Sequence, residues 1–370
     1  MEPDAADQPP THAERIVVLA LSALGDLILS LPLLGEARRI YRNARFTFVC
    51  QRPAVAAFAR ELGVAEEVVA LPPTGRRSPV ALCRSLRRMR LLRADITLQS
   101  FASHGSFGNL IAGATGAAIC CGFESGRFQN RLTHRIPVRP DKHLIDLNLD
   151  LLRRLGHREV RNPVSRFLPR IEERSARWPA GSLTARYGPY LVISVGSDPT
   201  LAFKRWPAEK WARLTRRLAA DGLTCVFIGH RSECEGIDRI LAMADGAGVN
   251  LAGETDFADL AAVIASSLGV VATDGMPLHF AAALGKTCVG IFGPTHPDIG
   301  GPWGPLHENV YLELPCSPCY GSLTVGKTIA CTTHECLRYL PVEEVYQKVL
   351  KMLHATLPPV PSRVLSSRAE

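Results

Sequence analysis

The sequence predicts an α/β protein made of two domains, each with a parallel sheet. Its 370 residues exceed one ordinary domain of roughly 100–200 residues and suit two. Short apolar runs rich in β-branched residues alternate with longer stretches of helical periodicity, which is typical of parallel sheets with crossover helices. Residues 163–189 are rich in proline and have no clear periodicity, which indicates a boundary between two such series.

The predicted elements follow in order along the chain. Apolar runs predict strands at residues 15–21, 45–50, 67–70, 96–99, 190–195, 224–228, 269–272, 287–291 and 309–312. Helical patterns follow most of them, including residues 208–221 and 257–265. The resulting division is a disordered tail at 1–14, an N-terminal domain at 15–165, a linker at 166–189, a C-terminal domain at 190–340, a last helix at 341–355 and a disordered tail at 356–370.

Composition bounds the class and the compartment. Hydrophobic residues make up 46% of the chain and charged residues 21%, which excludes a disordered or fibrous protein. The first 14 residues are acidic and proline-rich, unlike a signal peptide. The apolar run at 16–34 contains Asp26 and Pro32, which disfavours a membrane span. We therefore expect a cytoplasmic protein whose eleven cysteines are reduced.

The net charge of +8 is unevenly distributed. Residues 1–165 carry the whole excess, and without the acidic tail residues 15–165 reach +12. The run at 76–93 holds seven arginines and no acid, with Arg84, Arg87 and Arg88 spaced to share a helix face. Such a face is either merely solvated or binds an anionic partner, because arginine recognises phosphate bidentately. No aromatic residue interleaves this run, so we expect no nucleic acid partner.

The first strand leads into a short turn and a helix. Asp26 falls at the start of that helix, where the helix dipole favours a carboxylate. Ligands of open α/β sheets bind outside the carboxyl ends of the strands, so Asp26 is either a catalytic carboxylate or a helix cap. The turn lacks the GxGxxG pattern, which counts against a dinucleotide site.

Polar residues follow four strands of the second half. They are Ser197, Thr200 and Lys204 after the strand at 190–195, Glu233 after 224–228, Asp274 and His279 after 269–272, and Thr295 after 287–291. Loops and helix N-termini that meet at one sheet edge form an anion site, to which Lys204 adds a positive charge. A nucleotide diphosphate is the ligand this pattern favours. Taken singly, Lys204 also fits a solvated lysine and His279 a core histidine.

Four cysteines lie close together in the sequence, in the order Cys316, Cys319, Cys331 and Cys336. Their spacing suits four thiolates around one tetrahedral metal, with free thiols as the alternative. Four thiolates leave no open coordination position, so a metal here would be a structural clip. The same segment contains GSLTVGKT at 321–328, which matches the Walker A pattern but lacks the strand before it and the helix after it.

Several motifs resemble those of glycosyltransferase family 9, the lipopolysaccharide-core heptosyltransferases. The main ones are LSALGD at 21–26, KRWP at 204–207, TDGMPLHFAAALGK at 273–286 and FGPTHPDIGGPWG at 292–304. Shorter matches are GFESGR at 122–127, LTHRIPV at 132–138 and HLIDLNLDLLRRLG at 143–156. The chain departs from the family pattern after Asp274, where Gly275 replaces a hydroxyl residue and Met276 replaces a glycine.

The resemblance implies the GT-B architecture, in which two Rossmann-like domains face each other across a cleft and the last helix returns to the first domain. It implies that Asp26 is the general base and that Lys204 stabilises the leaving diphosphate. Further donor contacts are expected from Ser197, Thr200, Glu233, Asp274, Gly275, His279 and Thr295. Acceptor contacts are expected from Arg84, Arg87, Arg88 and Arg127. In one branch of the family a comparable cysteine cluster holds iron, so the metal at the four cysteines would be zinc or iron.

The function implied is an inverting glycosyltransferase. It would move a heptose from ADP-heptose to an anionic lipid-linked oligosaccharide, the lipopolysaccharide inner core, at the cytoplasmic face of the inner membrane. The reaction is expected to need no cofactor. The alternatives are a glycosyltransferase acting on a protein of the autotransporter type or on a natural product, and a nucleotide-sugar-binding protein without transfer activity.

Overall fold

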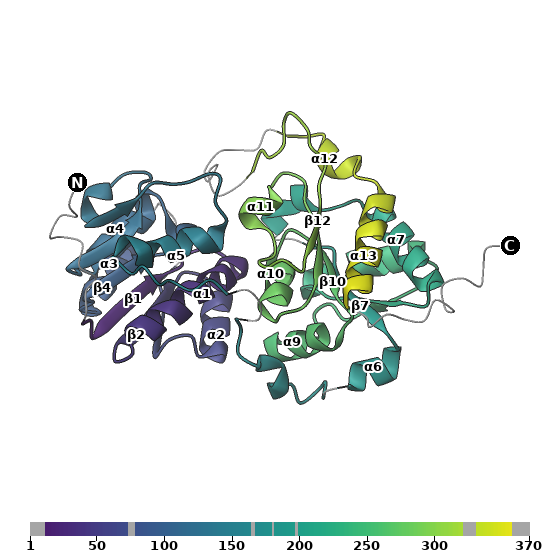
Figure 1. Ribbon diagram of the computed structural model, residues 1–370, viewed down its shortest axis with the longest axis horizontal. Helices are drawn as coiled ribbons and strands as arrows, with labels where there is room; N and C mark the ends of the chain where they lie inside the picture. The colour runs from purple at the N-terminus through teal and green to yellow at the C-terminus, as the bar shows by residue number, and fades with distance from the viewer. Residues whose placement is uncertain are drawn as a thin grey trace. The chain divides into compact units, whose positions relative to one another are not determined.

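The chain divides into two compact units, Met1–Pro163 and Val164–Glu370. The computed structural model describes residues 12–72, 78–163, 167–179, 181–196, 199–320 and 331–356. Each unit contains a six-stranded parallel sheet with helices packed against it (Figure 1). The prediction of an α/β protein with two Rossmann-like domains is thus confirmed. Both predicted tails fall almost wholly outside the described residues.

The sheet of the first unit has the strand order β3-β2-β1-β4-β5-β6. Its strands are β1 (Arg15–Leu19), β2 (Arg45–Cys50), β3 (Glu67–Ala70), β4 (Ile96–Gln99), β5 (Ile119–Phe123) and β6 (His134–Ile136). Ile16 lies opposite Phe46 of β2 on one side and opposite Ile96 of β4 on the other. The strand order reverses at β1 and β4, and ligands of open α/β sheets bind at such a switch point.

Helices enclose this sheet because its residues are apolar on both faces. They are α1 (Leu24–Ile40), α2 (Pro53–Leu62), α3 (Pro79–Leu91), α4 (Ser106–Ala114) and α5 (Leu144–Arg154), with short 3₁₀ turns η1 (Phe101–Ser103) and η2 (Gln129–Arg131). Val17 and Leu19 pack in one core cluster with Met89 of α3 and Ile111 of α4. The alternate residues of β1 point to the opposite face and are equally buried.

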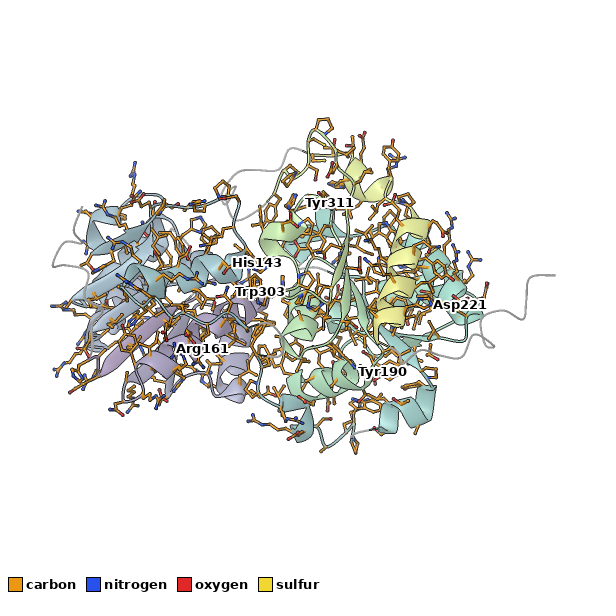
Figure 2. The ribbon with its side chains drawn as sticks, in the orientation of Figure 1. His143, Arg161, Tyr190, Asp221, Trp303 and Tyr311 are labelled. Carbon is orange, nitrogen blue, oxygen red and sulfur yellow. The ribbon has the colours of Figure 1, made fainter. Side chains whose placement is uncertain are left out.

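The sheet of the second unit has the order β12-β11-β10-β7-β8-β9. Its strands are β7 (Tyr190–Ser194), β8 (Thr224–Phe227), β9 (Val249–Asn250), β10 (Val270–Thr273), β11 (Cys288–Ile291) and β12 (Glu308–Val310). Its helices are α6 (Ser182–Tyr187), α7 (Ala208–Ala220), α8 (Cys234–Met243), α9 (Phe257–Ser266), α10 (Met276–Ala283), α11 (Pro297–Gly300), α12 (Glu335–Arg338) and α13 (Val342–Thr356), with η3 (Ile171–Arg174), η4 (Pro199–Lys204) and η5 (Arg231–Glu233). Tyr190 is buried, and its hydroxyl donates to the carbonyl of Val263 in α9 (Figure 2).

The segment predicted as a linker contributes to the core of the second unit. Within it, η3 packs on α9, and Ile171, Trp178 and Leu183 are buried. The backbone N–H groups of Phe167 and Leu168 both donate to the carbonyl of Ala283. Apolar residues spaced among the prolines thus anchor a stretch that has no periodicity of its own.

The last helix, α13, packs on α7, β11 and β12 of the second unit. Its apolar side is represented by Val345, Val349 and Met352 in the same core cluster as Trp211. The Tyr346 hydroxyl also donates to Asp221 over 2.9 Å. Its expected return to the first domain stays a prediction. Within the described ranges, no helix is both long and apolar enough to cross a membrane.

Candidate active site

In the first unit, Asp26 lies at the carboxyl end of β1, in the first turn of α1. Ala23 is extended and caps the helix, and its backbone N–H donates to Asp26 Oδ2 over 2.9 Å. The capping role considered from the sequence is therefore real. A carboxylate has about four acceptor sites, and this capping bond uses one of them. The half-buried Asp26 is thus held in a fixed orientation by its own helix.

The loop after β4 fixes the turn that carries Asp26. Ser103 Oγ accepts from the N–H of Leu21 at 2.8 Å and donates to the carbonyl of Leu19 at 3.0 Å. Ser22 Oγ donates to the carbonyl of Ala102 at 2.7 Å. Since Ser103 is buried, water does not compete for its two bonds. The chain just before Asp26 is therefore tied to the neighbouring strand's loop.

Arg127 lies in the loop that follows β5. Asn109 of α4 donates to the carbonyls of Ser125 and Arg127, at 2.7 and 2.9 Å, and Ser106 Oγ accepts from the N–H of Arg127. The Arg127 side chain is exposed. Because β5 runs parallel to β1, Arg127 and Asp26 belong to the same edge of the sheet.

The arginines of α3 are placed differently. Arg84 and Arg87 are exposed, and Arg88 lies 3.9 Å from Glu67, in a weak and exposed pair. Glu67 is the first residue of β3, so it lies at the sheet edge opposite to the one that carries Asp26. Of the four arginines predicted to bind an acceptor, the structure places only Arg127 at the edge of Asp26.

In the second unit, Asp274 is the centre of a buried polar cluster at the carboxyl end of β10. Its Oδ2 atom accepts from Lys204 Nζ and from Thr295 Oγ1, each over 2.7 Å. His279 Nε2 lies 3.8 Å from Oδ1. Lys204 belongs to η4 after β7, His279 to α10 after β10, and Thr295 to the loop after β11. The ends of these three neighbouring strands therefore converge, as the sequence predicted.

The charge state of Asp274 follows from its partners. Burial alone would raise the pKa of this carboxyl, because Asp274 is only 9% exposed. The charge of Lys204, the nearby His279 and the hydrogen bonds from Lys204 and Thr295 hold its pKa below the usual range. Asp274 and Lys204 therefore form a buried ion pair.

Glu233 lies at the neighbouring strand end and is joined to the cluster through Gly196. The N–H of His230 donates to Glu233 Oε2 over 2.8 Å. A Cβ atom built on Gly196 would come within 1.5 Å of Glu233 Oε1, so a larger residue at 196 displaces that carboxylate. The carbonyl of Gly196 accepts from Thr273 Oγ1, next to Asp274.

Helix α10 starts within this site. Gly275 is its N-cap and, unlike a serine or threonine, has no side chain to bond the first N–H groups of the helix. This is the position at which the chain departs from the family pattern. Of the other residues predicted to contact the donor, Ser197 lies outside the described residues. Thr200 belongs to η4, and only its backbone is described.

Comparison with known proteins identifies the family. A model described as glycosyltransferase family 9 (heptosyltransferase) matches residues 89–329. The chain belongs to this family. It is therefore a glycosyltransferase, as the sequence motifs predicted.

Relatives of this family 9 glycosyltransferase extend over most of the chain. Lipopolysaccharide heptosyltransferase 1 of Pseudomonas aeruginosa is 26% identical over 325 residues, which are 82% of this chain and 86% of that protein. A family 9 glycosyl transferase of Veillonella parvula has a TM-score of 0.71 at 21% identity, covering 93% of this chain and 98% of that one. Escherichia coli ADP-heptose heptosyltransferase II has a TM-score of 0.68 at 18% identity, with coverages of 92% and 99%. These structural likenesses show the GT-B fold.

The four cysteines do not form a metal centre in the described structure. Burial and the neighbouring thiols of Cys331 and Cys316 raise the pKa of Cys319, so these thiols share one region. However, no three His, Cys, Asp or Glu side chains among the described residues are grouped to hold a metal ion. The heptosyltransferase TibC, which is iron-containing, has a TM-score of 0.55 to this chain at 12% identity. The expectation of a structural zinc or iron at Cys316, Cys319, Cys331 and Cys336 is thus not supported here.

Sequence reasoning missed one residue of the site, Tyr320. Its ring centre lies 5.1 Å from Lys204 Nζ. No motif includes it, because the contact joins segments far apart in the chain. The adjoining Walker-like segment at 321–328 lies outside the described residues.

Proposed function

We propose that this protein transfers a heptose from ADP-heptose to an anionic lipid-linked oligosaccharide, the lipopolysaccharide inner core, with inversion at the anomeric carbon. The observation that carries the proposal is the buried cluster of Lys204, Asp274 and Thr295 beside the uncapped start of α10. A lysine and a helix N-terminus at one sheet edge suit a nucleotide diphosphate. The choice of heptose as the sugar and of lipopolysaccharide as the acceptor rests on the names of the relatives.

In the reaction we propose, the acceptor hydroxyl oxygen forms a bond to the anomeric carbon of the donor. The bond from that carbon to the phosphate oxygen breaks, and its electron pair leaves on ADP. Lys204 and the N–H groups of α10 stabilise the negative charge that develops there. The hydroxyl proton passes to the Asp26 carboxylate, and general-base assistance of this kind contributes about 10²–10⁴-fold. One displacement inverts the anomeric configuration.

The other donor contacts extend from this cluster. We assign Glu233, which lies beside Gly196, to the ribose hydroxyls, from which its carboxylate would accept hydrogen bonds. Asp274 holds Lys204 in place and meets the donor together with Thr295, His279 and Gly275. Ser197 and Thr200, which precede Lys204 in the sequence, are assigned to the remaining phosphate contacts.

The arginines of the first unit are assigned two different roles, one toward the acceptor and one toward the membrane. Arg127, at the edge of Asp26, is assigned to the anionic sugars of the acceptor. The face of α3 is assigned to an anionic membrane surface, since the exposed Val80 and Leu91 follow the spacing i, i+4, i+7, i+11 with Arg84 and Arg87 between them. Apolar residues flanked by arginines suit the interface of an anionic bilayer.

A binding screen tests the donor assignment. Calorimetric titration with ADP, UDP and GDP should give saturable binding for ADP, at least tenfold weaker binding for the others, and weaker ADP binding for Lys204→Met. Tighter binding of UDP or GDP would contradict the proposed donor. Equal ADP binding by wild type and Lys204→Met would contradict the assigned role of Lys204.

A further inference from the structure

The segment that carries the cysteines is fastened to the donor loop of the second unit. The N–H groups of Cys319 and Tyr320 both donate to the carbonyl of Pro294, at 3.0 and 2.8 Å. Ser317 Oγ donates to the carbonyl of Gly293. These two carbonyls directly precede Thr295, which binds Asp274. The loop that supplies Thr295 and the cysteine segment therefore form one connected structure.

This attachment places the aromatic ring of Tyr320 against Lys204. The ring centre is 5.1 Å from Lys204 Nζ, within the range of a cation–π interaction. The ring also packs edge-on against Phe203, with centroids 5.1 Å apart and planes at 69°. Phe203 precedes Lys204 in η4, so the aromatic pair braces the backbone of the lysine as well as its charge.

We propose that Tyr320 is a positioning residue for the Lys204 ammonium group, an inference that rests on the proposed role of Lys204 at the donor diphosphate. The ammonium lies between the Asp274 carboxylate and the face of the ring. The carboxylate fixes one N–H of the lysine, and the ring occupies space into which the long side chain would otherwise rotate. We assign the other N–H groups of the ammonium to the donor.

The proposal gives the cysteine segment a function that needs no metal. Its hydrogen bonds to the carbonyls of Gly293 and Pro294 deliver an aromatic ring to the donor site. The segment then matters for donor binding through Tyr320 rather than through a coordinated ion.

Ring substitutions measure this role. A cation–π contact of this kind corresponds to about a 3–30-fold change in affinity. ADP titration should therefore show 3–30-fold weaker binding for Tyr320→Leu, near wild-type binding for Tyr320→Phe, and equal or tighter binding for Tyr320→Trp, because indole is the strongest cation–π partner. Tyr339→Leu removes an exposed tyrosine elsewhere and should change nothing. Wild-type affinity in Tyr320→Leu, or equal damage in Tyr320→Phe, would overturn the proposal.

A double-mutant cycle tests whether Tyr320 acts through the lysine. In a Lys204→Met background, Tyr320→Leu should weaken ADP binding no further. An undiminished effect in that background would overturn the positioning role. Unchanged ADP binding in Lys204→Met itself would overturn both this inference and the assigned role of Lys204. If Lys204→Met binds ADP more weakly than wild type while Tyr320→Leu binds it normally, the inference about Tyr320 alone would be overturned. The ring series needs no Lys204 variant, so the inference remains testable if Lys204→Met does not fold.

Discussion

At the scale of residues, the donor site is governed by one buried charge pair. Asp274 remains ionised in a buried position because Lys204 compensates it. Such pairs contribute little net stability, but removing one partner is costly because the other charge is left buried. The sequence could identify both residues from their strand-end positions. It could not predict their bond, because which side chains meet depends on the sheet order.

The first prediction concerns the pH dependence of this pair. Lys204→Met should lower the free energy of unfolding by about 3–5 kcal/mol at pH 7. The pKa of Asp274 is depressed in the native protein, so the stability it gives is present above the unfolded pKa and is lost as the pH falls through the folded pKa. Without Lys204, burial should raise the pKa of Asp274, so at low pH the carboxyl of the native variant is protonated and no buried charge is left unpaired. The stability deficit of the variant should therefore narrow toward pH 4.

Urea denaturation at pH 7 and pH 4 measures the difference. The double variant Lys204→Met/Asp274→Asn is the control, since it contains no buried charge and its deficit should be smaller and nearly independent of pH. A Lys204→Met deficit that stays constant between the two pH values would contradict the ion-pair account.

The second prediction concerns Gly196. In Gly196→Ala the new methyl group displaces the Glu233 carboxylate, which is the flexible end of its side chain. We expect ADP binding to weaken several-fold while the melting temperature changes little. Gly236→Ala, where a Cβ meets open space, is the matched control and should bind ADP normally. Unaltered ADP affinity in Gly196→Ala would argue against a donor contact by Glu233.

At the scale of elements, the strands that are rich in β-branched or aromatic residues could be predicted from the sequence, whereas several others could not. The runs at 45–50, 67–70 and 96–99 match β2, β3 and β4 residue for residue, because at least half of the residues in each are β-branched or aromatic. The structure adds β5, β6 and β9, which were not predicted. β5 contains two cysteines and a glycine, and β6 and β9 are only three and two residues long, so their pairing depends on neighbouring strands.

The same limit applies to the predicted functional segments. The arginine spacing on α3 was readable from the sequence, but its direction relative to Asp26 required the topology of β3. The spacing of the four cysteines suggested a metal site, but the described residues contain no group of side chains arranged to hold a metal ion. Nothing in the sequence indicated a role for Tyr320, because its partner Lys204 lies in η4, far away in the chain.

The third prediction belongs to helix α3. Arg84→Glu/Arg87→Glu should reduce binding to vesicles that contain anionic lipid at least tenfold in sedimentation assays at low salt, because a basic residue near such a surface contributes about 1 kcal/mol. Transfer to a water-soluble acceptor should keep its kcat. The control is Arg213→Glu/Arg216→Glu, an equal reversal on α7 of the second unit. Undiminished vesicle binding in the α3 variant would refute the membrane assignment.

At the scale of the whole molecule, charge separates the two units. The excess of +8 lies entirely in residues 1–165, while residues 166–370 are neutral. The neutral unit holds a local cation, Lys204, inside its donor cluster. The basic unit holds Asp26. Of its four arginines predicted to bind the acceptor, Arg127 lies at the sheet edge of Asp26, and Arg84, Arg87 and Arg88 lie on α3. This division fits a transferase whose acceptor is anionic.

The measurement that tests the central claim most directly compares heptose transfer by wild type and Asp26→Asn, from ADP-heptose to the lipid-linked inner-core oligosaccharide. The asparagine keeps the size of the side chain, so the fold and ADP binding should be unchanged. The account predicts a kcat lower by about 10²–10⁴-fold in Asp26→Asn with an unaltered Kd for ADP. Equal turnover by the two proteins would contradict it.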